Sequence, residues 1–167
     1  MQHTFVYLQS KFCVKYLLAT LLIFFYPAIS FCQNMYWQQQ VNYTIEVTLN
    51  DKEKSLNAFE KITYTNNSPD TLTFIWFHLW SNAYKNDKTA FAEQTLQNGS
   101  TKFYFSSEES KGYINQLDFK VNGGNATIEE HPQHIDIIKL VLPKPLAPKQ
   151  SINITTPFFV QLPNNFS

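Results

Sequence analysis

The chain has 167 residues, 44% of them hydrophobic and 16% aromatic, so it can bury one core and leaves little room for two domains. Its 13 basic residues are all lysine and balance 13 acidic residues. Without arginine it cannot grip phosphate or carboxylate bidentately, and it has no basic stripe, so the composition argues against a nucleic-acid partner.

The first 32 residues predict a secretory signal peptide with a helical apolar part. A lysine-bearing flank precedes the apolar run Tyr16–Ile29, which is shorter than the roughly 20 residues that cross a bilayer. Cleavage after Ser30 and cleavage after Cys32 both remain open. Acylation of Cys32 is a further alternative, and the bulky Phe31 before it argues against a lipid anchor.

Export also bears on the redox chemistry of the chain. Cys13 and Cys32 both lie in the signal segment, so a mature chain beginning at Gln33 has no disulfide and no thiol. Its 11 lysines and 13 acidic residues give a net charge of 11 − 13 = −2, so we expect no membrane binding by charge after signal cleavage. A cysteine-free exported chain indicates a bacterial envelope protein, periplasmic or secreted.

Three strands are predicted next, joined by short polar turns as an antiparallel meander. Val41–Leu49 alternates between apolar and polar residues, Ser55–Asn66 is the predicted return strand, and Thr71–Trp80 is the third. The first strand has five side chains that we expect to point inward: Val41, Tyr43, Ile45, Val47 and Leu49.

The third strand, Thr71–Trp80, is apolar on both faces. It begins with strict alternation, with Phe74 and Trp76 on one face, and from Ile75 onward the second face is apolar too. A two-layer sandwich covers only one face of each sheet. We therefore expect a second body, outside this chain, to pack near Thr71–Trp80.

A less regular region follows this strand. Residues 81–100 predict a loop with one or two helical turns around Ala90–Gln97, and Lys102–Phe105 predicts a short strand. The Asn-Gly pair at 122–123 predicts a hairpin between Tyr113–Val121 and Asn125–Glu130.

The last part of the chain predicts two more strands. His134–Leu142 is apolar on both faces, and Ser151–Val160 alternates. Between them Pro143, Pro145 and Pro148 predict a loop. Because no segment sustains a 3.6-residue period, the predicted fold class is all-β, an antiparallel two-sheet sandwich.

The histidines do not form a convincing metal site. His131 and His134 make a His-x-x-His pair, but Pro132 between them disfavours the helix that would align both rings, so a hairpin loop is the preferred interpretation. We expect His78, in the aromatic strand, to be a half-buried histidine whose ring nitrogens are satisfied by neighbours.

Catalytic motifs are also missing from the sequence. The adjacent carboxylates Glu108-Glu109 and Glu129-Glu130 would point to opposite faces of a strand, which does not suit a glycosidase pair. There is no Gly-x-Ser-x-Gly, no His-Glu-x-x-His and no glycine-rich loop. We predict no catalytic, cofactor-binding or metal-binding residue here. Five Asn-x-Ser/Thr sites are expected to be surface polar residues: Asn42, Asn66, Asn98, Asn125 and Asn153.

Three segments, taken in order, resemble the N-terminal domain of the gluzincin zinc aminopeptidases (peptidase family M1, the aminopeptidase N family), in the exported form common in Bacteroidetes. They are Val41–Tyr84, which contains VNYTIEVTLN and LTFIWFHLWSNAY, then Gly112–Gly123 (GYINQLDFKVNG), and Lys139–Pro163 (KLVLPKPLAPKQSINITTPFFVQLP). Each segment is moderately specific, and their order and spacing carry the resemblance, which covers residues 36–167.

The resemblance implies a saddle-like β-sandwich over 36–167 that packs on a catalytic peptidase domain. That family binds zinc through His-Glu-x-x-His and a distant glutamate, and holds the substrate amine with a Gly-x-Met-Glu-Asn strand. Neither motif occurs before the chain stops at Ser167. We therefore expect a structural and substrate-framing domain of an exported metallopeptidase, inactive alone, whose zinc lies in a missing or separate catalytic domain.

A second hypothesis comes from a different class of function. The chain would then be a free-standing binding or adhesion sandwich for peptide or carbohydrate, which uses the exposed aromatic residues Trp37, Trp76 and Trp80.

Overall fold

The computed structural model describes residues 36–164, so the predicted signal peptide at 1–32 lies outside the described residues. From Trp37 to the end of the described residues, the chain forms one compact unit. In the described part of the chain, no helix has the length and apolar character needed to cross a bilayer.

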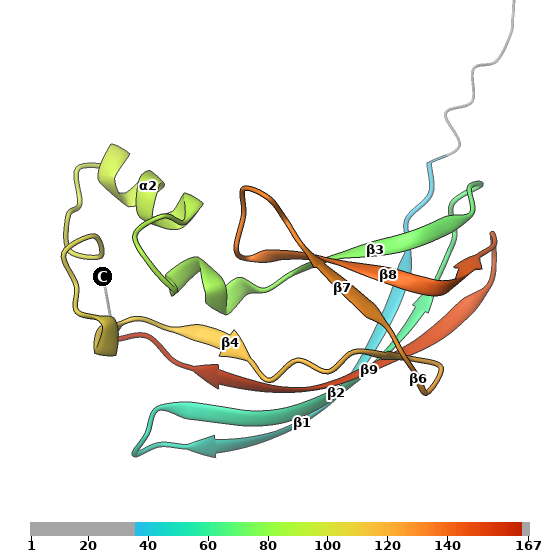
Figure 1. Cartoon of the computed structure of the whole chain (residues 1–167), viewed down its shortest axis with the longest axis horizontal. Coiled ribbons are helices and arrows are strands. Elements are labelled where there is room, and N and C mark those ends of the chain that lie inside the picture. The colour runs from blue at the N-terminus through green and yellow to red at the C-terminus, as the bar shows by residue number, and fades with distance from the viewer. Residues whose placement is uncertain (1–35, 165–167) are drawn as a thin grey trace, which may run out of the picture. The chain divides into compact units, whose positions relative to one another are not determined.

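Two antiparallel sheets form this unit, which confirms the all-β sandwich (Figure 1). The larger sheet has the strand order β1-β2-β9-β5-β6, with β4 also paired to β9. Its strands are β1 (Gln40–Asn50), β2 (Ser55–Thr65), β4 (Tyr113–Asn115), β5 (Lys120–Val121), β6 (Gly124–Asn125) and β9 (Ser151–Gln161). The smaller sheet, in the order β3-β8-β7, contains β3 (Leu72–His78), β7 (Thr127–Glu130) and β8 (Ile137–Leu146).

The core lies between the two sheets. Ile62 of β2, Ile154 of β9 and Leu140 of β8 are almost completely buried and belong to one hydrophobic cluster. On the inner face of β3, Ile75 and Phe77 pack against the same cluster. The free energy gained by burying these apolar faces is the main contribution that holds the small sheet on the larger one.

The predicted meander is wrong at its third strand. β1 and β2 pair antiparallel over their whole length, but β3 pairs with β8 in the other sheet. The edge of β2 is occupied by β9 in an unbroken register from Ser55↔Gln161 to Thr65↔Ser151, so no edge is left for β3.

Asn66 marks the crossing between the sheets. Its side-chain amide donates to the carbonyl oxygens of Asp70 (2.7 Å) and Leu146 (3.0 Å), and its side-chain oxygen accepts from the Ser68 hydroxyl (2.6 Å). Asn66 is fully buried, so its prediction as a surface residue is wrong. The other four Asn-x-Ser/Thr asparagines are exposed, as predicted: Asn42, Asn98, Asn125 and Asn153.

Two other predictions differ from the structure. β8 continues through Pro143 and Pro145, where a loop was predicted, because the β3–β8 register shifts between Leu72 and Phe74 and leaves the prolines in an irregular stretch. Residues 102–105 form a turn instead of the predicted strand, with the Phe105 amide donating to the Thr101 carbonyl.

The Asn-Gly hairpin is confirmed. Asn122 and Gly123 have φ values of 50° and 83°, and the flanking residues Val121 and Gly124 are paired. The strand predicted at Tyr113–Val121 is interrupted, because Gln116 has a φ of 58° and separates β4 from β5.

The helical prediction is confirmed at α2, which spans Ala90–Gln97. Thr89 caps it, accepting from the Ala92 amide (3.2 Å) and donating to the Ala83 carbonyl (2.7 Å). Ala83 belongs to the 3₁₀ helix η2 (Trp80–Tyr84), so this cap joins α2 to the end of β3. A second short 3₁₀ helix, η3, covers Glu108–Ser110.

Candidate functional site

A histidine–aspartate pair lies where β3 ends. His78 Nε2 is 2.9 Å from Asp136 Oδ2, and the Asp136 carbonyl accepts from the Leu79 amide at 2.6 Å. Asp136 lies in the loop from β7 to β8 and is buried. The expected neighbour of His78 is therefore found at Nε2, and it is Asp136, but the expectation of a half-buried ring is wrong because the His78 side chain is exposed at the end of β3.

Trp80 follows immediately at the start of η2. The centre of its ring lies 3.9 Å from that of His78, with the two planes inclined at 57°. The indole is nevertheless 74% exposed. The contact with His78 therefore orients a tryptophan that faces solvent.

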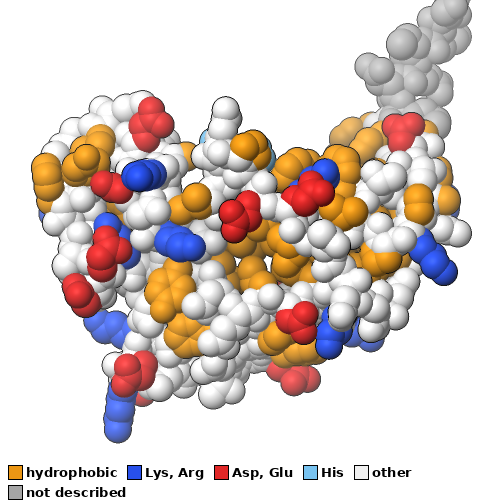
Figure 2. Space-filling model, viewed as in Figure 1, with side chains coloured by type: hydrophobic (Ala, Val, Ile, Leu, Met, Phe, Trp, Pro, Cys, Tyr) orange, Lys and Arg blue, Asp and Glu red, His pale blue; other side chains and the backbone are white. Residues whose placement is uncertain are grey.

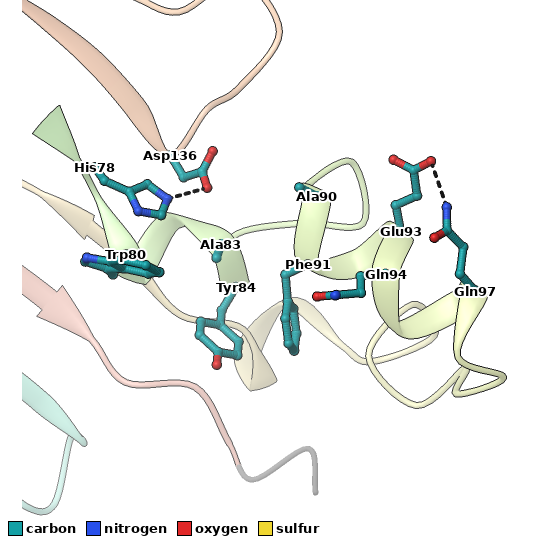
Figure 3. A pocket seen from close by; sticks show the side chains of 10 residues that line it. All are labelled: His78, Trp80, Ala83, Tyr84, Ala90, Phe91, Glu93, Gln94, Gln97 and Asp136. Carbon is teal, nitrogen blue, oxygen red and sulfur yellow. Dashed lines mark hydrogen bonds and ion pairs between the residues drawn. The ribbon is translucent and has the colours of Figure 1, made fainter. Parts of the chain in front are cut away.

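These residues form one wall of an open groove of about 710 Å³, here called the Trp80 groove. Figure 3 shows His78, Asp136 and Trp80 at one end, and the side chains of α2 at the other. The aromatic rings of Tyr84 and Phe91 lie between them. The remaining lining residues are Ala83, Ala90, Glu93, Gln94 and Gln97.

An aromatic cluster holds the far wall in place. The ring centres of Tyr84 and Phe91 are 4.6 Å apart, and Phe103 packs edge-on against Phe91 at 5.1 Å. Phe103 is almost completely buried. Buried aromatic contacts of this kind fix α2 against η2, so the groove has a preformed shape.

His131 and His134 lie outside this groove. His131 and His134 are in the β7–β8 hairpin loop, as predicted, and their ring centres are 4.8 Å apart. His131 Nδ1 accepts from the amides of Gln133 and His134, both at 3.2 Å. That nitrogen closes the turn of the loop. Within residues 36–164 there is no cluster of three or more His, Cys, Asp or Glu side chains suited to a metal ion.

The carboxylate pairs are engaged in local contacts. Glu108 lies 2.7 Å from the buried Lys111, and Glu129 lies 2.8 Å from Lys139 on the neighbouring strand. Hydrogen bonds to its own backbone amide and to Ser107 lower the pKa of Glu109. The Glu108-Glu109 pair lies in η3 and not on a strand. The Glu129-Glu130 pair lies within β7, where neighbouring side chains alternate between the two faces.

Two apolar surfaces lie outside the core. The outer face of β3 presents Phe74 and Trp76, and Trp76 is 49% exposed. The prediction that Thr71–Trp80 is apolar on both faces is confirmed, since the inner face of the strand packs on the core and the outer face keeps Phe74 and Trp76 partly exposed, while the second body expected there stays a prediction. In Figure 2, hydrophobic side chains are also visible in the hollow between the two sheets.

The second surface is on β1 and contradicts the expected burial of its inward residues. Its register with β2 places them on the face of Ile62, as predicted, but four of them remain 50–60% exposed. These four are called the β1 strip: Tyr43, Ile45, Val47 and Leu49. β1 is an edge strand, and its apolar face is left uncovered by the small sheet.

A carboxylate lies within this second surface. Glu60 is paired directly with Ile45 and shares its face of the sheet. Burial raises the pKa of the Glu60 carboxyl above its ordinary value. Glu60 also lines a smaller hollow of about 380 Å³ between the sheets, together with Tyr43 and Phe77.

No protein-family model matches this chain, and no curated protein sequence matches it. Among solved structures, it is similar to a two-domain M1 zinc metallopeptidase, determined as a mutant bound to L-arginine. The sequence identity is 12% and the TM-score 0.43, with 72% of this chain covered. This chain spans only 20% of the length of that protein.

The sequence reasoning found some parts of the groove and missed others. It singled out His78, Trp80 and the helix at Ala90–Gln97, but it did not bring them together. It also missed Asp136 as the partner of His78, because 58 residues separate them and only the β3–β8 pairing places them side by side.

Proposed function

We propose that this chain is the N-terminal β-sandwich of an exported zinc metallopeptidase of family M1, and that it frames the substrate path of a catalytic domain it does not contain. The support begins with the three segments that resemble this family. Val41–Tyr84 supplies β1, β2, β3 and η2, Gly112–Gly123 supplies β4 and β5, and Lys139–Pro163 covers most of β8 and all of β9. All three contribute to the one hydrophobic core.

The observation that carries the proposal is the pair of uncovered apolar surfaces, on the outer face of β3 and along the β1 strip. A large apolar side chain contributes about 1.5–3 kcal/mol when it is fully buried. Both surfaces therefore forgo stabilisation that a neighbouring domain would restore. Contiguous apolar patches of this kind mark protein–protein interaction sites.

The chemistry of the parent enzyme is assigned to the other domain. No His-Glu-x-x-His occurs in the 167 residues, so this chain supplies neither the zinc ligands nor the general base of that motif. The sandwich would instead provide a rigid wall against which the catalytic domain and its peptide substrate are positioned. Peptide hydrolysis, zinc and export are thus proposed for the whole protein.

Glu60 sets a condition on the docking partner. A body that covers the β1 strip would also remove water from the Glu60 carboxylate, and an unpaired buried charge is costly. The partner surface must therefore offer a hydrogen-bond donor there, or bind the protonated carboxyl.

The test uses the mature chain, residues 33–167, and a catalytic-domain polypeptide with His-Glu-x-x-His encoded in the same genome. We expect the two to bind, measured by calorimetry, and we expect Trp76→Ala or Val47→Lys to weaken binding about tenfold or more. Thr48→Lys is the matched control, since Thr48 points to the opposite face of β1.

Two results would overturn the proposal. One is that every available catalytic domain fails to bind, or binds both surface variants as tightly as the wild type. The other is zinc-dependent cleavage of aminoacyl fluorogenic substrates by the mature chain alone. Export is tested separately, by fusing residues 1–35 to a reporter enzyme that is active only outside the cytoplasm.

A further inference from the structure

Trp80 differs from the other tryptophans of residues 36–164. Trp37 and Trp76 are each about half exposed, and neither lines the groove. Trp80 is 74% exposed and stands at the entrance of a preformed groove. This inference concerns that groove and does not depend on the proposed peptidase role.

The orientation of Trp80 is maintained by a chain of contacts. The buried Asp136 holds the His78 ring at 2.9 Å, and the His78 ring lies against the indole at 3.9 Å. Asp136 is itself fixed by the bond from the Leu79 amide to its carbonyl. A polar pair whose aspartate is buried therefore supports one side of an indole whose large exposed area contributes nothing to the core.

The opposite wall presents planar polar groups. Glu93, Gln94 and Gln97 project from α2, and Gln97 donates to Glu93 at 3.3 Å (Figure 3). Together with Asp136 they offer carboxylate acceptors and amide donors on either side of an aromatic floor. No lysine lines the groove. Phosphorylated, sulfated or uronic-acid ligands would therefore meet two carboxylates and no cation.

We propose that the Trp80 groove binds a neutral saccharide. The apolar face of one sugar ring would stack on the Trp80 indole near Asp136, and hydroxyls of further rings of the same oligosaccharide would bond to Glu93 and Gln94 at the other end. A sugar hydroxyl both donates and accepts, which matches a wall of mixed acceptors and donors. The groove volume of about 710 Å³ lies within the range of small-ligand sites, roughly 300–1,000 Å³.

A cationic ligand is the competing interpretation, because aromatic rings and carboxylates also attract ammonium groups. The neutral amides of the groove favour the saccharide. Gln94 and Gln97 line it beside the carboxylates, and an amide can donate to and accept from sugar hydroxyls but adds no charge that attracts an ammonium group. The two interpretations differ in salt dependence, since only binding of a cation weakens strongly as ionic strength rises.

The experiment titrates the mature chain with neutral hexasaccharides: cellohexaose, laminarihexaose, xylohexaose, maltohexaose and N-acetylchitohexaose. Binding is followed by tryptophan fluorescence and calorimetry, with hexalysine as the cationic probe. We expect at least one saccharide to bind with a Kd below about 5 mM, and equally well at about 50 and about 500 mM salt.

Variants assign the site. Trp80→Ala should raise the Kd about tenfold or more, and Gln94→Ala about 3- to 10-fold. Trp76→Ala is the matched control and should leave the Kd unchanged, because Trp76 lies outside the groove. Circular dichroism confirms that each variant is folded. Trp76→Ala is also the variant that should weaken docking of the catalytic domain under the proposed function. Because docking depends on Trp76 and saccharide binding on Trp80, either proposal can fail without the other.

Three outcomes would overturn the saccharide assignment. The first is no binding to any of the five saccharides. The second is saccharide binding that Trp80→Ala leaves intact. The third is salt-sensitive binding of hexalysine alone, which would identify the groove as a site for cationic peptide groups.

Discussion

Replacing Asn66 with alanine should destabilise the sandwich strongly, although this residue forms no part of the hydrophobic core. Its side-chain amide donates to two backbone carbonyls, and its side-chain oxygen accepts from the amide and hydroxyl of Ser68 and from Gln39. These bonds join the end of β2 to the end of β8, where the chain crosses between sheets. Asn66→Ala removes all of them, so the Leu146 carbonyl and the buried Ser68 amide lose these partners, while the Ser68 hydroxyl keeps its bond to the Asp70 carbonyl.

The expected loss follows from the number of bonds. At about 1 kcal/mol each, with a further penalty for buried groups left unpaired, the free energy of unfolding should fall by about 4–6 kcal/mol. That is a large part of the roughly 5–15 kcal/mol of a typical domain. Urea unfolding of the mature chain, followed by circular dichroism and tryptophan fluorescence, measures the change.

Asn67→Ala is the matched control. Asn67 is in the same turn, and its side chain makes one exposed bond, to the Gln38 carbonyl at 3.0 Å. Its loss should stay within about 0.5–1 kcal/mol. If Asn66→Ala costs no more than Asn67→Ala, the buried amide does not join the sheets energetically, and the reasoning fails.

Three further predictions concern other parts of the fold. Burial raises the pKa of Glu60 above its ordinary value of 4.5, so the folded state favours the protonated carboxyl. The contribution of this carboxyl to the free energy of unfolding is therefore fully present below pH 4.5 and is lost as the pH rises through the raised pKa. Glu60→Gln should therefore be more stable than the wild type at pH 7 and lose this advantage below pH 4.5, which urea unfolding across the pH range checks. Leu140→Ala removes a fully buried side chain and should cost about 2–5 kcal/mol in the same assay, whereas the exposed Leu96→Ala should cost far less. Gly112→Ala would place a Cβ 2.8 Å from the Gln161 carbonyl and 2.6 Å from Pro163 Cδ, so it should lower the melting temperature and increase hydrogen exchange in β4.

The sequence was most informative where the signal was local. The alternation of β1 and β2, the Asn-Gly hairpin and the helix at Ala90–Gln97 each follow from neighbouring residues, and all were predicted. The strand pairing was not, because whether β3 continues beside β2 depends on β9, which lies some 80 residues later and occupies that edge. The buried role of Asn66 was hidden for the same reason, since one of its bonds reaches Leu146.

The candidate groove shows the same division. The exposed tryptophan, its histidine neighbour and the helix were visible as separate sequence features. Their assembly depends on Asp136, contributed by a loop whose position follows from the β7–β8 and β3–β8 pairings. No spacing rule relates His78 to Asp136. The sequence alone therefore could not predict that Trp80 packs against a His78 ring that Asp136 holds in place.

The two proposals together explain why aromatic side chains on this small sheet remain outside the core. Phe74 and Trp76 lie on the flat outer face of β3, where a cation–π contact from Lys139 to the Phe74 ring is a local polar cover. A strand face suits another protein surface, and the apolar area buried between the two would stabilise the complex. Trp80 lies beyond the end of the strand, on the 3₁₀ helix that turns away from the sheet, where it overhangs a groove. A ring in that position suits a small ligand, so Trp76→Ala and Trp80→Ala should affect different partners although the two tryptophans are only four positions apart.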